Sequence, residues 1–399
     1  MAAQESGNST PVPASDSSFD PDWWRGAMLY QIYPRSFQDS NGDGVGDLPG
    51  IIERLDYVKG LGVEGIWISP FFASPMADFG YDVSDYRKVD PIFGNNDDAD
   101  RLIAEADKRG LPVIVDMVMS HTSDRHKWFE ESASSRDNPK ADWYVWADPE
   151  LGEDGERQPP NNWKSVFGGS SWQWHEGRQQ YYLHNFDKAQ PDLNMHNPDV
   201  QEAMLGEVEY WLKKGVKGLR LDAINFLCHD LELRDCPVKS GTAGNSYSEL
   251  EHIYDKNRPE TLDFIRRLRK LTDQYPGAFM VGEIGDDNGM GIAKSYTNGD
   301  DLLHTAYNFS LFDRSLSAGY IKGVFEYYDG LPGDGYASWA ISNHDVPRAA
   351  SRWGGPDPDS ARAKQLNALL ALLPGTVFMY QGEELGLPDA PIPEELFDK

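Results

Sequence analysis

The sequence has little cysteine, no long apolar run and a shortage of basic residues. Cys228 and Cys236 are the two cysteines among 399 residues, so we predict neither a disulfide framework nor a zinc motif. No run of about 18 apolar residues occurs, so we expect no transmembrane helix. With 37 Lys and Arg against 65 Asp and Glu, the formal net charge is -28, which argues against nucleic acids and anionic membranes as partners.

The excess of acidic residues has two interpretations. Self-repulsion that keeps the protein in solution is the simpler interpretation. Adaptation to a salty cytoplasm is the other, and loss of activity at low salt would support it.

Residues 1–20 are polar and rich in Ser, Ala and Pro, without the basic and apolar regions of a signal peptide. We therefore predict a disordered segment at 1–20 and a cytoplasmic location.

Strand-like and helix-like stretches alternate along the rest of the chain. We predict strands at residues 28–33, 63–68, 111–118, 218–225, 279–283, 302–312, 337–342 and 376–380. Helical spacing of apolar residues predicts helices at 48–60, 97–109, 198–214, 259–272 and 360–373. Eight strands that alternate with helices predict an α/β fold, the parallel (β/α)8 TIM barrel, whose functional sites lie at the carboxyl ends of the strands.

One long segment interrupts this alternation after the third strand. Residues 121–197 are rich in Trp, Asn, Gly and Pro and have no clean period, and the segment is too long for a simple connection. We predict a small inserted domain there, which divides the catalytic barrel into residues 21–120 and 198–399. The chain ends soon after the eighth strand, so we expect the second part of the barrel to be incomplete and the chain to be a fragment.

A charged pair lies on the fourth predicted strand. Leu219 and Leu221 alternate with Arg220 and Asp222, so the two charged side chains share one face of a buried strand. A structural ion pair is one interpretation, because burying charge is costly unless the charge is paired. The other is a functional site in which Arg220 favours the ionised form of Asp222.

The ends of other predicted strands decide between these interpretations. Asp116 and His121 end the third strand, Glu283 the fifth, and His344 and Asp345 the seventh. In a barrel these side chains converge with Asp222 at one mouth. Paired carboxyl groups suit cleavage of a glycosidic bond, with one as nucleophile or base and the other as acid. The apolar neighbours of Glu283 would raise its pKa, as an acid catalyst requires.

Six motifs carry a resemblance to a known family. They are QIYPRSF at 31–37, DMVMSH at 116–121, GLRLD at 218–222, VGE at 281–283, SNHD at 342–345 and QGEE at 381–384. On these motifs, residues of about 20 to 390 resemble the α-amylase clan of glycoside hydrolases (family 13), in its α-glucosidase and oligo-1,6-glucosidase branch. The family's C-terminal β domain is absent from this chain, as is an Arg that follows the eighth strand in the family and closes the glucose pocket.

The resemblance implies a role for each residue of the mouth. It implies Asp222 as nucleophile, Glu283 as general acid and base, Asp345 as a clamp on the sugar hydroxyls, and retention of the α configuration. Further residues that would bind the terminal glucose are Asp78, Tyr81, His121, Arg220 and His344. Phe167 and Phe186 resemble the aromatic residues that the inserted domain contributes to the pocket, although core packing would also explain them.

A short acidic loop after the first strand has the spacing of a calcium site. Oxygen donors occupy positions 1, 3, 5 and 9 and a backbone carbonyl position 7: Asp39, Asn41, Asp43, Asp47 and Val45. The loop lacks the Glu that an EF-hand has at position 12, and an Asx-rich turn without metal is the alternative. The resembling enzymes hold one Ca²⁺ here, so we expect structural Ca²⁺, with Mg²⁺ as a substitute.

The residue after the proposed nucleophile bears on the bond that is cleaved. In this branch of the family, Val goes with α-1,6 links and smaller residues with α-1,4 links, so Ala223 favours maltose-like substrates. We predict an exo-acting α-glucosidase with transglucosylation, acting on a small α-glucoside. The alternatives are an oligo-1,6-glucosidase, a glucosyltransferase or sucrose isomerase, and a non-enzymatic sugar-binding or transporter-associated protein on the same fold. The oligomeric state is left open.

Overall fold

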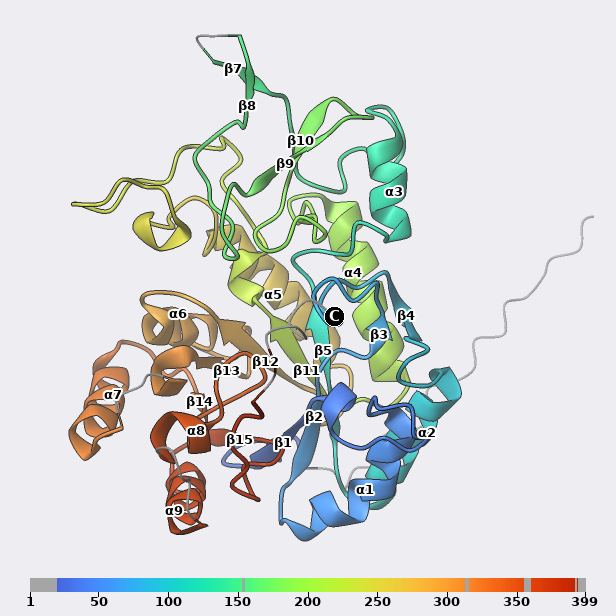
Figure 1. The fold of residues 1–399 in the computed structure, drawn as a ribbon, viewed down its shortest axis with the longest axis vertical. Helices are drawn as coiled ribbons and strands as arrows, with labels where there is room; N and C mark the ends of the chain where they lie inside the picture. Colours follow the sequence, from blue (N-terminus) through green and yellow to red (C-terminus); the bar gives the residue numbers. More distant parts are fainter. Residues whose placement is uncertain (1–19, 153–154, 313–315, 355–359, 392, 394–399) are drawn as a thin grey trace, which may run out of the picture.

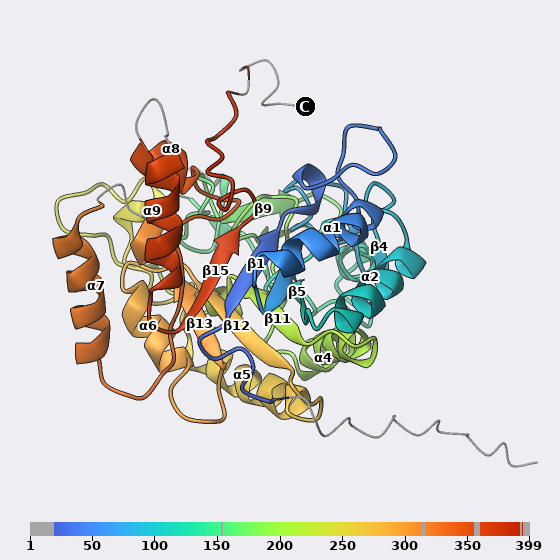
Figure 2. The same ribbon diagram turned by 90° about the horizontal axis from the view of Figure 1, so that it is seen from below.

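The computed structural model describes residues 20–152, 155–312, 316–354, 360–391 and 393, and its centre is a ring of eight parallel strands (Figures 1 and 2). The strands are β1 (Met28–Ile32), β2 (Gly65–Ile68), β5 (Val113–Val118), β11 (Gly218–Asp222), β12 (Phe279–Ile284), β13 (Thr305–Asn308), β14 (Ser338–Ala340) and β15 (Thr376–Tyr380). A parallel bridge between Ala306 and Ala337 joins the two ends of the sheet. The predicted (β/α)8 barrel is confirmed: seven strands lie inside their predicted ranges, and β12 extends one residue beyond its range, to Ile284.

Helices surround this ring on the outside, as the view from below shows (Figure 2). The sequence predicts α1 (Leu48–Gly60), α2 (Asn96–Lys108), α4 (Pro198–Lys213), α5 (Pro259–Thr272) and α9 (Ser360–Ala371). Outside the inserted segment, three described helices were not predicted: α6 (Gly289–Tyr296) and α8 (Ala349–Gly354), which are short, and α7 (Ala318–Gly330), which is as long as α1. Side-chain caps fix several helix starts; the Asp47 carboxylate, for example, accepts the Gly50 N–H at the start of α1.

Alternation along each strand separates the barrel interior from the layer under the helices. On β11, Leu219 and Leu221 belong to the large core cluster that also takes in buried side chains of the surrounding helices. A second cluster fills the interior of the barrel: Trp24, Ala27, Leu29, Trp67, Ile114, Phe279, Val281, Tyr307, Phe312, Ala340 and Phe378. Arg220 is paired in register with Asp116 of β5 and Val281 of β12, so its side chain also points into the barrel.

The segment between β5 and α4 builds a separate small structure at the carboxyl ends of the strands (Figure 1). It contains α3 (Lys127–Ser134), the antiparallel sheet of β6 (Trp146–Ala147), β10 (Gln180–Leu183) and β9 (Trp172–His175), and the hairpin of β7 (Glu150–Leu151) and β8 (Arg157–Gln158). β3 (Phe72–Ala73) and β4 (Asp85–Val89) pair outside the main sheet. The inserted structure thus lies where the sequence predicts it, and its limits at residues 121 and 197 stay a prediction.

A second long segment lies at the same end of the barrel. It connects β11 to α5, contains the short helices η2 (Ile224–Phe226) and η3 (Tyr247–Glu249), and lies beside the inserted structure (Figure 1). Hydrogen bonds join the two: Asn162 Nδ2 donates to the Cys236 carbonyl, and Cys236 N–H donates to Asn162 Oδ1. Two segments far apart in sequence therefore share the space over the barrel mouth.

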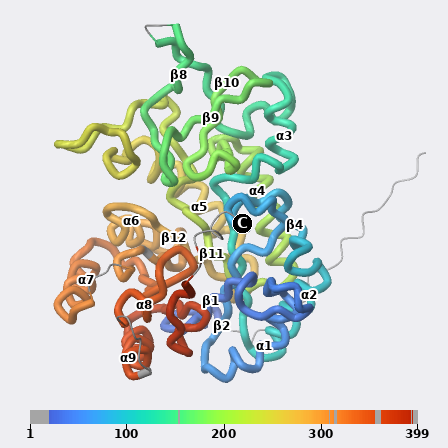
Figure 3. The backbone as a smooth tube through the Cα atoms, in the orientation of Figure 1, coloured from blue at the N-terminus to red at the C-terminus, as the bar shows by residue number. Residues whose placement is uncertain are grey.

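The ends of the chain bear on two expectations from composition. The predicted disordered segment at 1–20 falls, apart from Asp20, outside the described residues. Where the structure is described, no helix combines the length and the apolar character that crossing a membrane requires. In the tube of Figure 3, the first strand of the ring lies close to the last elements of the chain, as the pairing of β1 with β15 requires.

Candidate active site

Arg220 of β11 is the centre of the site, and its guanidinium contacts three carboxylates. Nη1 lies 2.9 Å from Asp116 Oδ1 and 2.6 Å from Asp222 Oδ1, and Nη2 lies 2.6 Å from Glu283 Oε1. The Arg220 side chain is 1% exposed. A planar guanidinium presents its N–H donors in a fixed fork, so it fixes the positions of the oxygens that it contacts. Asp222 and Glu283 are thereby held close to each other at the ends of adjacent strands.

Two further contacts position the Glu283 carboxylate. The backbone N–H of Ala223 donates to Glu283 Oε2 at 3.1 Å, and the Tyr307 hydroxyl lies 3.3 Å from Oε1. Ala223 has a left-handed backbone, with φ of 39°, where β11 turns into η2. This turn aims its N–H at the carboxylate of the next strand. A non-glycine residue in this conformation is uncommon and often occurs at functional sites.

One cation for three buried carboxylates leaves the cluster short of positive charge. Burial raises the pKa of Glu283 to about 8, with the charges of Asp222 and Asp345 adding to the rise and Arg220 opposing it. Burial likewise raises the pKa of Asp222 to about 7, again against the attraction of Arg220. Arg220 therefore acts in the predicted direction on Asp222, but desolvation outweighs it. Glu283 holds its proton more strongly than Asp222, which suits an acid beside a nucleophile.

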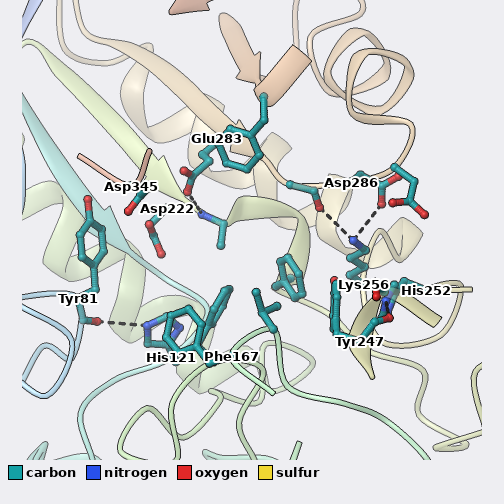
Figure 4. A pocket seen from close by; sticks show the side chains of 18 of the residues that line it. Tyr81, His121, Phe167, Asp222, Tyr247, His252, Lys256, Glu283, Asp286 and Asp345 are labelled. Carbon is teal, nitrogen blue, oxygen red and sulfur yellow. Dashed lines mark hydrogen bonds and ion pairs between the residues drawn. The ribbon is translucent and has the colours of Figure 1, made fainter. Parts of the chain in front are cut away.

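A cavity of about 580 Å³ opens above these carboxylates. Asp222, Glu283 and Asp345 lie together on one side of it (Figure 4). The Asp345 side chain is 52% exposed and lies 3.3 Å from His344 Nε2. The three carboxylates that the sequence singles out therefore share one cavity, and Asp345 is the most accessible of them.

Asp78, Tyr81 and His121 line the same cavity near Asp222 (Figure 4 labels the last two). His121 is buried, its Nε2 lies 3.2 Å from the Tyr81 carbonyl oxygen, and burial lowers its pKa to about 4, so the ring is neutral near pH 7. Gln190 Nε2 donates to Asp78 Oδ2 at 2.8 Å. Burial raises the pKa of Asp78 to about 7. These groups present donors and acceptors to a polar ligand.

His344 does not line the cavity but lies beneath Tyr81. The two rings are stacked, with centroids 5.3 Å apart. Gln31 Nε2 donates to His344 Nδ1, which assigns the ring proton to Nε2, 2.7 Å from the Tyr81 hydroxyl; that hydroxyl then donates to Asp116 Oδ2. His344 and Arg220 do not line the cavity but contact residues that do, and their predicted contact with the sugar stays a prediction.

The two phenylalanines predicted from the inserted domain also reach the cavity. Phe167 is 60% exposed, and its ring lies 5.7 Å from that of Phe186, edge to face. Phe186 in turn contacts the rings of His121 and Phe226, at 5.3 and 5.2 Å. Core packing explains Phe186 in part, whereas the exposure of Phe167 favours contact with a ligand.

The wall opposite the carboxylates comes from residues that the sequence analysis missed. Tyr247, His252 and Lys256 belong to the segment between β11 and α5, and Asp286 follows β12 (Figure 4). Lys256 Nζ donates to the Gly285 carbonyl at 3.0 Å and lies 3.2 Å from Asp286 Oδ2. Only the length of the aperiodic stretch between the fourth strand and the next helix could have indicated this wall.

The predicted calcium loop follows η1 (Pro34–Ser36) and is held by its own side chains. The Asp39 carboxylate accepts N–H bonds from Asn41, Gly42 and Gly44, and Asp43 Oδ1 accepts the Val45 N–H. Asp47 caps α1 and also accepts the Ser40 hydroxyl. The atoms that this loop could offer to a metal are all oxygens, which hard cations such as Ca²⁺ prefer as ligands. The hydrogen bonds within the loop are equally consistent with an Asx-rich turn that binds no metal.

Comparison with known proteins assigns the family. The model of the alpha-amylase catalytic domain matches residues 31–399, so the chain belongs to the alpha-amylase family of glycoside hydrolases. It is 55% identical over 388 residues to a "Probable alpha-glucosidase" of Rhizobium meliloti (strain 1021), covering 94% of this chain and 70% of that protein. It is 44% identical over 380 residues to "Maltase 1" of Drosophila virilis, covering 92% and 59%.

A solved structure agrees with this assignment. The crystal structure of an alpha-glucosyl transfer enzyme, XgtA, matches with a TM-score of 0.89 at 55% identity, covering 94% of this chain and 70% of that chain. The present chain therefore spans 59% to 70% of the length of these three relatives.

Proposed function

We propose that this chain hydrolyses terminal α-1,4-linked glucose from maltose-like oligosaccharides and glucosides, with retention of configuration. The observation that carries the proposal is that one guanidinium, Arg220, contacts both Asp222 and Glu283 under a sugar-sized cavity. Carboxyl groups held this close suit the retaining geometry, in which roughly 5 Å separates nucleophile and acid. The names of the relatives support an α-glucoside as the substrate class.

In the first step, the Asp222 carboxylate attacks the anomeric carbon of the terminal glucose. The glycosidic bond breaks, and Glu283 gives its proton to the leaving oxygen, so that a covalent glucosyl-enzyme forms. The raised pKa of Glu283 keeps this proton available near neutral pH. Asp345, exposed to the cavity, would accept hydrogen bonds from the sugar hydroxyls and favour the positive charge that develops on the ring.

In the second step, the ionised Glu283 removes a proton from water, and the water oxygen displaces Asp222 from the anomeric carbon. Glucose leaves with its original configuration, and Glu283 is protonated again. Asp78 and His121 would bind the hydroxyls of the terminal glucose, and Tyr81 would contact its ring. Phe167 would cover the sugar from the inserted segment, since its ring is exposed at the cavity.

Glucosyl transfer is the second candidate function. XgtA is described as an alpha-glucosyl transfer enzyme, and this chain is 55% identical to it over the aligned residues. Transfer uses the same covalent intermediate, with a sugar hydroxyl in place of water. Tyr247 and Phe226 line the cavity and would stack against an acceptor sugar there.

Ca²⁺ in the loop at residues 39–47 is a separate proposal. Asp39, Asp43 and Asp47, with the Asn41 amide and the Val45 carbonyl, would hold the ion, and water would complete the six to eight oxygens that Ca²⁺ takes. Its role would be structural, because the loop lies on the chain between β1 and α1 rather than among the catalytic carboxylates.

One experiment tests the proposed reaction and its stereochemistry. The 399-residue chain is mixed with p-nitrophenyl α-glucoside and followed by proton NMR, which separates the two anomers of the glucose that is released. We expect α-glucose to appear first and to mutarotate later. Early β-glucose would contradict retention. Parallel assays with maltose, isomaltose and sucrose compare kcat/KM for each bond, and formation of longer glucosides from maltose would identify transfer.

A further inference from the structure

Among the described residues, one place brings three metal-ligating side chains within 4.8 Å of one another, and it is not the predicted calcium loop. The residues are Cys236, His252 and Asp255, in the segment between β11 and α5. They come from two arms of one hairpin-like turn, because Val238 pairs with Leu250 in an antiparallel bridge. Cys236 lies at the start of the first arm, and His252 and Asp255 follow the second.

The His252 ring is held between two acceptors. Nδ1 lies 2.6 Å from Asp255 Oδ2, and Nε2 lies 2.8 Å from the Tyr247 carbonyl oxygen. The ring also stacks on Tyr247, with centroids 3.7 Å apart. Cys236 and Asp255 are 1% and 0% exposed, and Asp255 Oδ1 has no hydrogen-bond partner although it is buried. The Asp255 carboxylate also forms a side-chain hydrogen bond with the Cys236 thiol, so the thiol, the imidazole and the carboxylate converge on one buried point.

This arrangement does not support a cysteine nucleophile. A thiol is activated by a neighbouring base or by positive charge, and the two nitrogens of His252 are already directed at Asp255 and the Tyr247 carbonyl. Burial and the negative charge of Asp255 raise the pKa of the Cys236 thiol to about 12.

We propose that Cys236, His252 and Asp255 form a site for Zn²⁺ or a cation of similar softness. Thiolate, imidazole and carboxylate are the donors that Zn²⁺ takes in tetrahedral sites, with water able to fill a fourth position. Thiolate and carboxylate together balance the two charges of the ion. The Nε2–H bond to the Tyr247 carbonyl is the outer-shell contact that orients a metal-bound histidine, and it leaves Nδ1 to the metal.

Binding requires only a local adjustment. Tetrahedral Zn²⁺ separates nitrogen and oxygen donors by roughly 3.3 Å, so Nδ1 of His252 and the Asp255 carboxylate must move apart by less than about 1 Å. The Cys236 sulfur lies within 4.8 Å of both and must come to roughly 3.6 Å from them. The proton on Nδ1 and the thiol proton are released when the metal binds. Lys256, which follows Asp255 in the sequence, is already paired with Asp286, so its charge is compensated.

The site would fasten the outer wall of the cavity to the inserted structure. The Asn162 side-chain amide of the inserted structure forms two hydrogen bonds with the backbone of Cys236, and Tyr247 and His252 line the cavity. A metal that joins Cys236 to His252 would therefore hold that wall in place. Zinc would act here as a structural ion, remote from the proposed reacting carboxylates.

Cobalt provides a direct test, because Co²⁺ replaces Zn²⁺ and absorbs light. Bound metal is first removed from the protein with a chelator, and the cysteines are kept reduced. The metal-free protein is then titrated with Co²⁺ and afterwards with Zn²⁺. We expect one equivalent of Co²⁺ to produce a thiolate-to-cobalt charge-transfer band in the near ultraviolet, which Zn²⁺ then abolishes. Binding in the calcium loop would give no such band, because that loop has no sulfur ligand.

Matched cysteine variants complete the test. Cys236→Ser should remove the band and weaken Zn²⁺ binding by at least about 100-fold, since even outer-shell partners contribute 10- to 100-fold. Cys228→Ser should leave both unchanged, because Cys228 is the other buried cysteine and is not in the cluster. His252→Gln serves if Cys236→Ser does not fold. A chain that folds and gives no thiolate band, or an equal loss in Cys228→Ser, would overturn the proposal, whatever the result of the glucosidase assays.

Discussion

Arg220 Nη1 lies 2.6 Å from Asp222 Oδ1, on the same strand and two residues away. The guanidinium spans the space between this carboxylate and its counterpart on the next strand, so it fixes the distance between the two groups proposed to act on the glycosidic bond. Arg220 and Asp222 both lie inside the barrel, because side chains two residues apart on a strand share a face. Predictions about catalysis, stability and pH follow from this arrangement.

Arg220→Lys should lower both stability and activity. Lysine keeps the charge but has no fork, so it cannot contact both Asp222 and Glu283 at once, and the buried carboxylates lose compensation. We expect the free energy of unfolding to fall by about 3–5 kcal/mol, measured by urea denaturation. Arg25→Lys is the control, because that arginine pairs with Asp22 at the surface, and it should change stability by less than about 1 kcal/mol.

Asp222→Asn should abolish turnover of p-nitrophenyl α-glucoside while the chain stays folded. An amide is nearly the same size as the carboxylate but is a poor nucleophile, so the covalent intermediate cannot form. The initial rate should fall by more than about a thousandfold, with unchanged circular dichroism. Asp56→Asn, at an exposed ion pair, should retain full activity. Rates within about tenfold of the parent chain would refute Asp222 as nucleophile.

Activity should follow a narrow bell-shaped dependence on pH. The proposed reaction needs Asp222 ionised and Glu283 protonated, and their pKa values are raised to about 7 and about 8. The two groups are close enough to titrate as a pair, so kcat/KM should rise and fall with apparent midpoints near these values. A profile flat from pH 5 to 9 would contradict this assignment.

The same shift predicts how stability varies with pH. The pKa of Glu283 is raised from 4.5 to about 8 in the folded chain, so between these values the folded state binds more protons than the unfolded state. Its contribution to stability is complete below about pH 4.5 and is lost as pH rises through about 8. Glu283→Gln should remove this part of the pH dependence. Urea midpoints at several pH values, compared for the variant and the parent chain, measure the difference.

Ala223→Val should move the bond preference from maltose toward isomaltose. Ala223 lines the cavity beside Asp222, and two added methyl groups would change the space for the leaving sugar. The ratio of kcat/KM values should change by about 10- to 200-fold. The left-handed backbone at Ala223 is costly for a β-branched residue, so the variant should also be less stable. Ala223→Gly relieves that strain without adding bulk and should keep the parent preference.

Removal of Ca²⁺ should lower the melting temperature by several degrees, because a ligand that binds only the folded state stabilises it. The Asp43→Ala variant should have, with or without Ca²⁺, the melting temperature that the parent chain has in chelator. The substitution removes a proposed ligand whose side chain is exposed and makes few other contacts. Asp22→Asn, at the surface and outside the loop, should respond to Ca²⁺ as the parent chain does. An unchanged melting temperature in chelator would favour the metal-free turn.

The sequence by itself determined the barrel and the positions of its carboxylates. Strand periodicity and the spacing of helices are local signals, and parallel topology brings all strand ends to one mouth. Asp222, Glu283 and Asp345 could therefore be placed together without coordinates. The prediction missed α6 and α8, which are short, and also α7, which is as long as α1.

Only the tertiary structure decided how the remaining residues are used. His344 lies at a strand end as predicted, yet stacking under Tyr81 turns it away from the cavity. The cluster of Cys236, His252 and Asp255 forms because an aperiodic turn folds back against the inserted structure. Contacts between irregular segments depend on long-range packing rather than on a repeating backbone geometry, so no spacing in the sequence specified them.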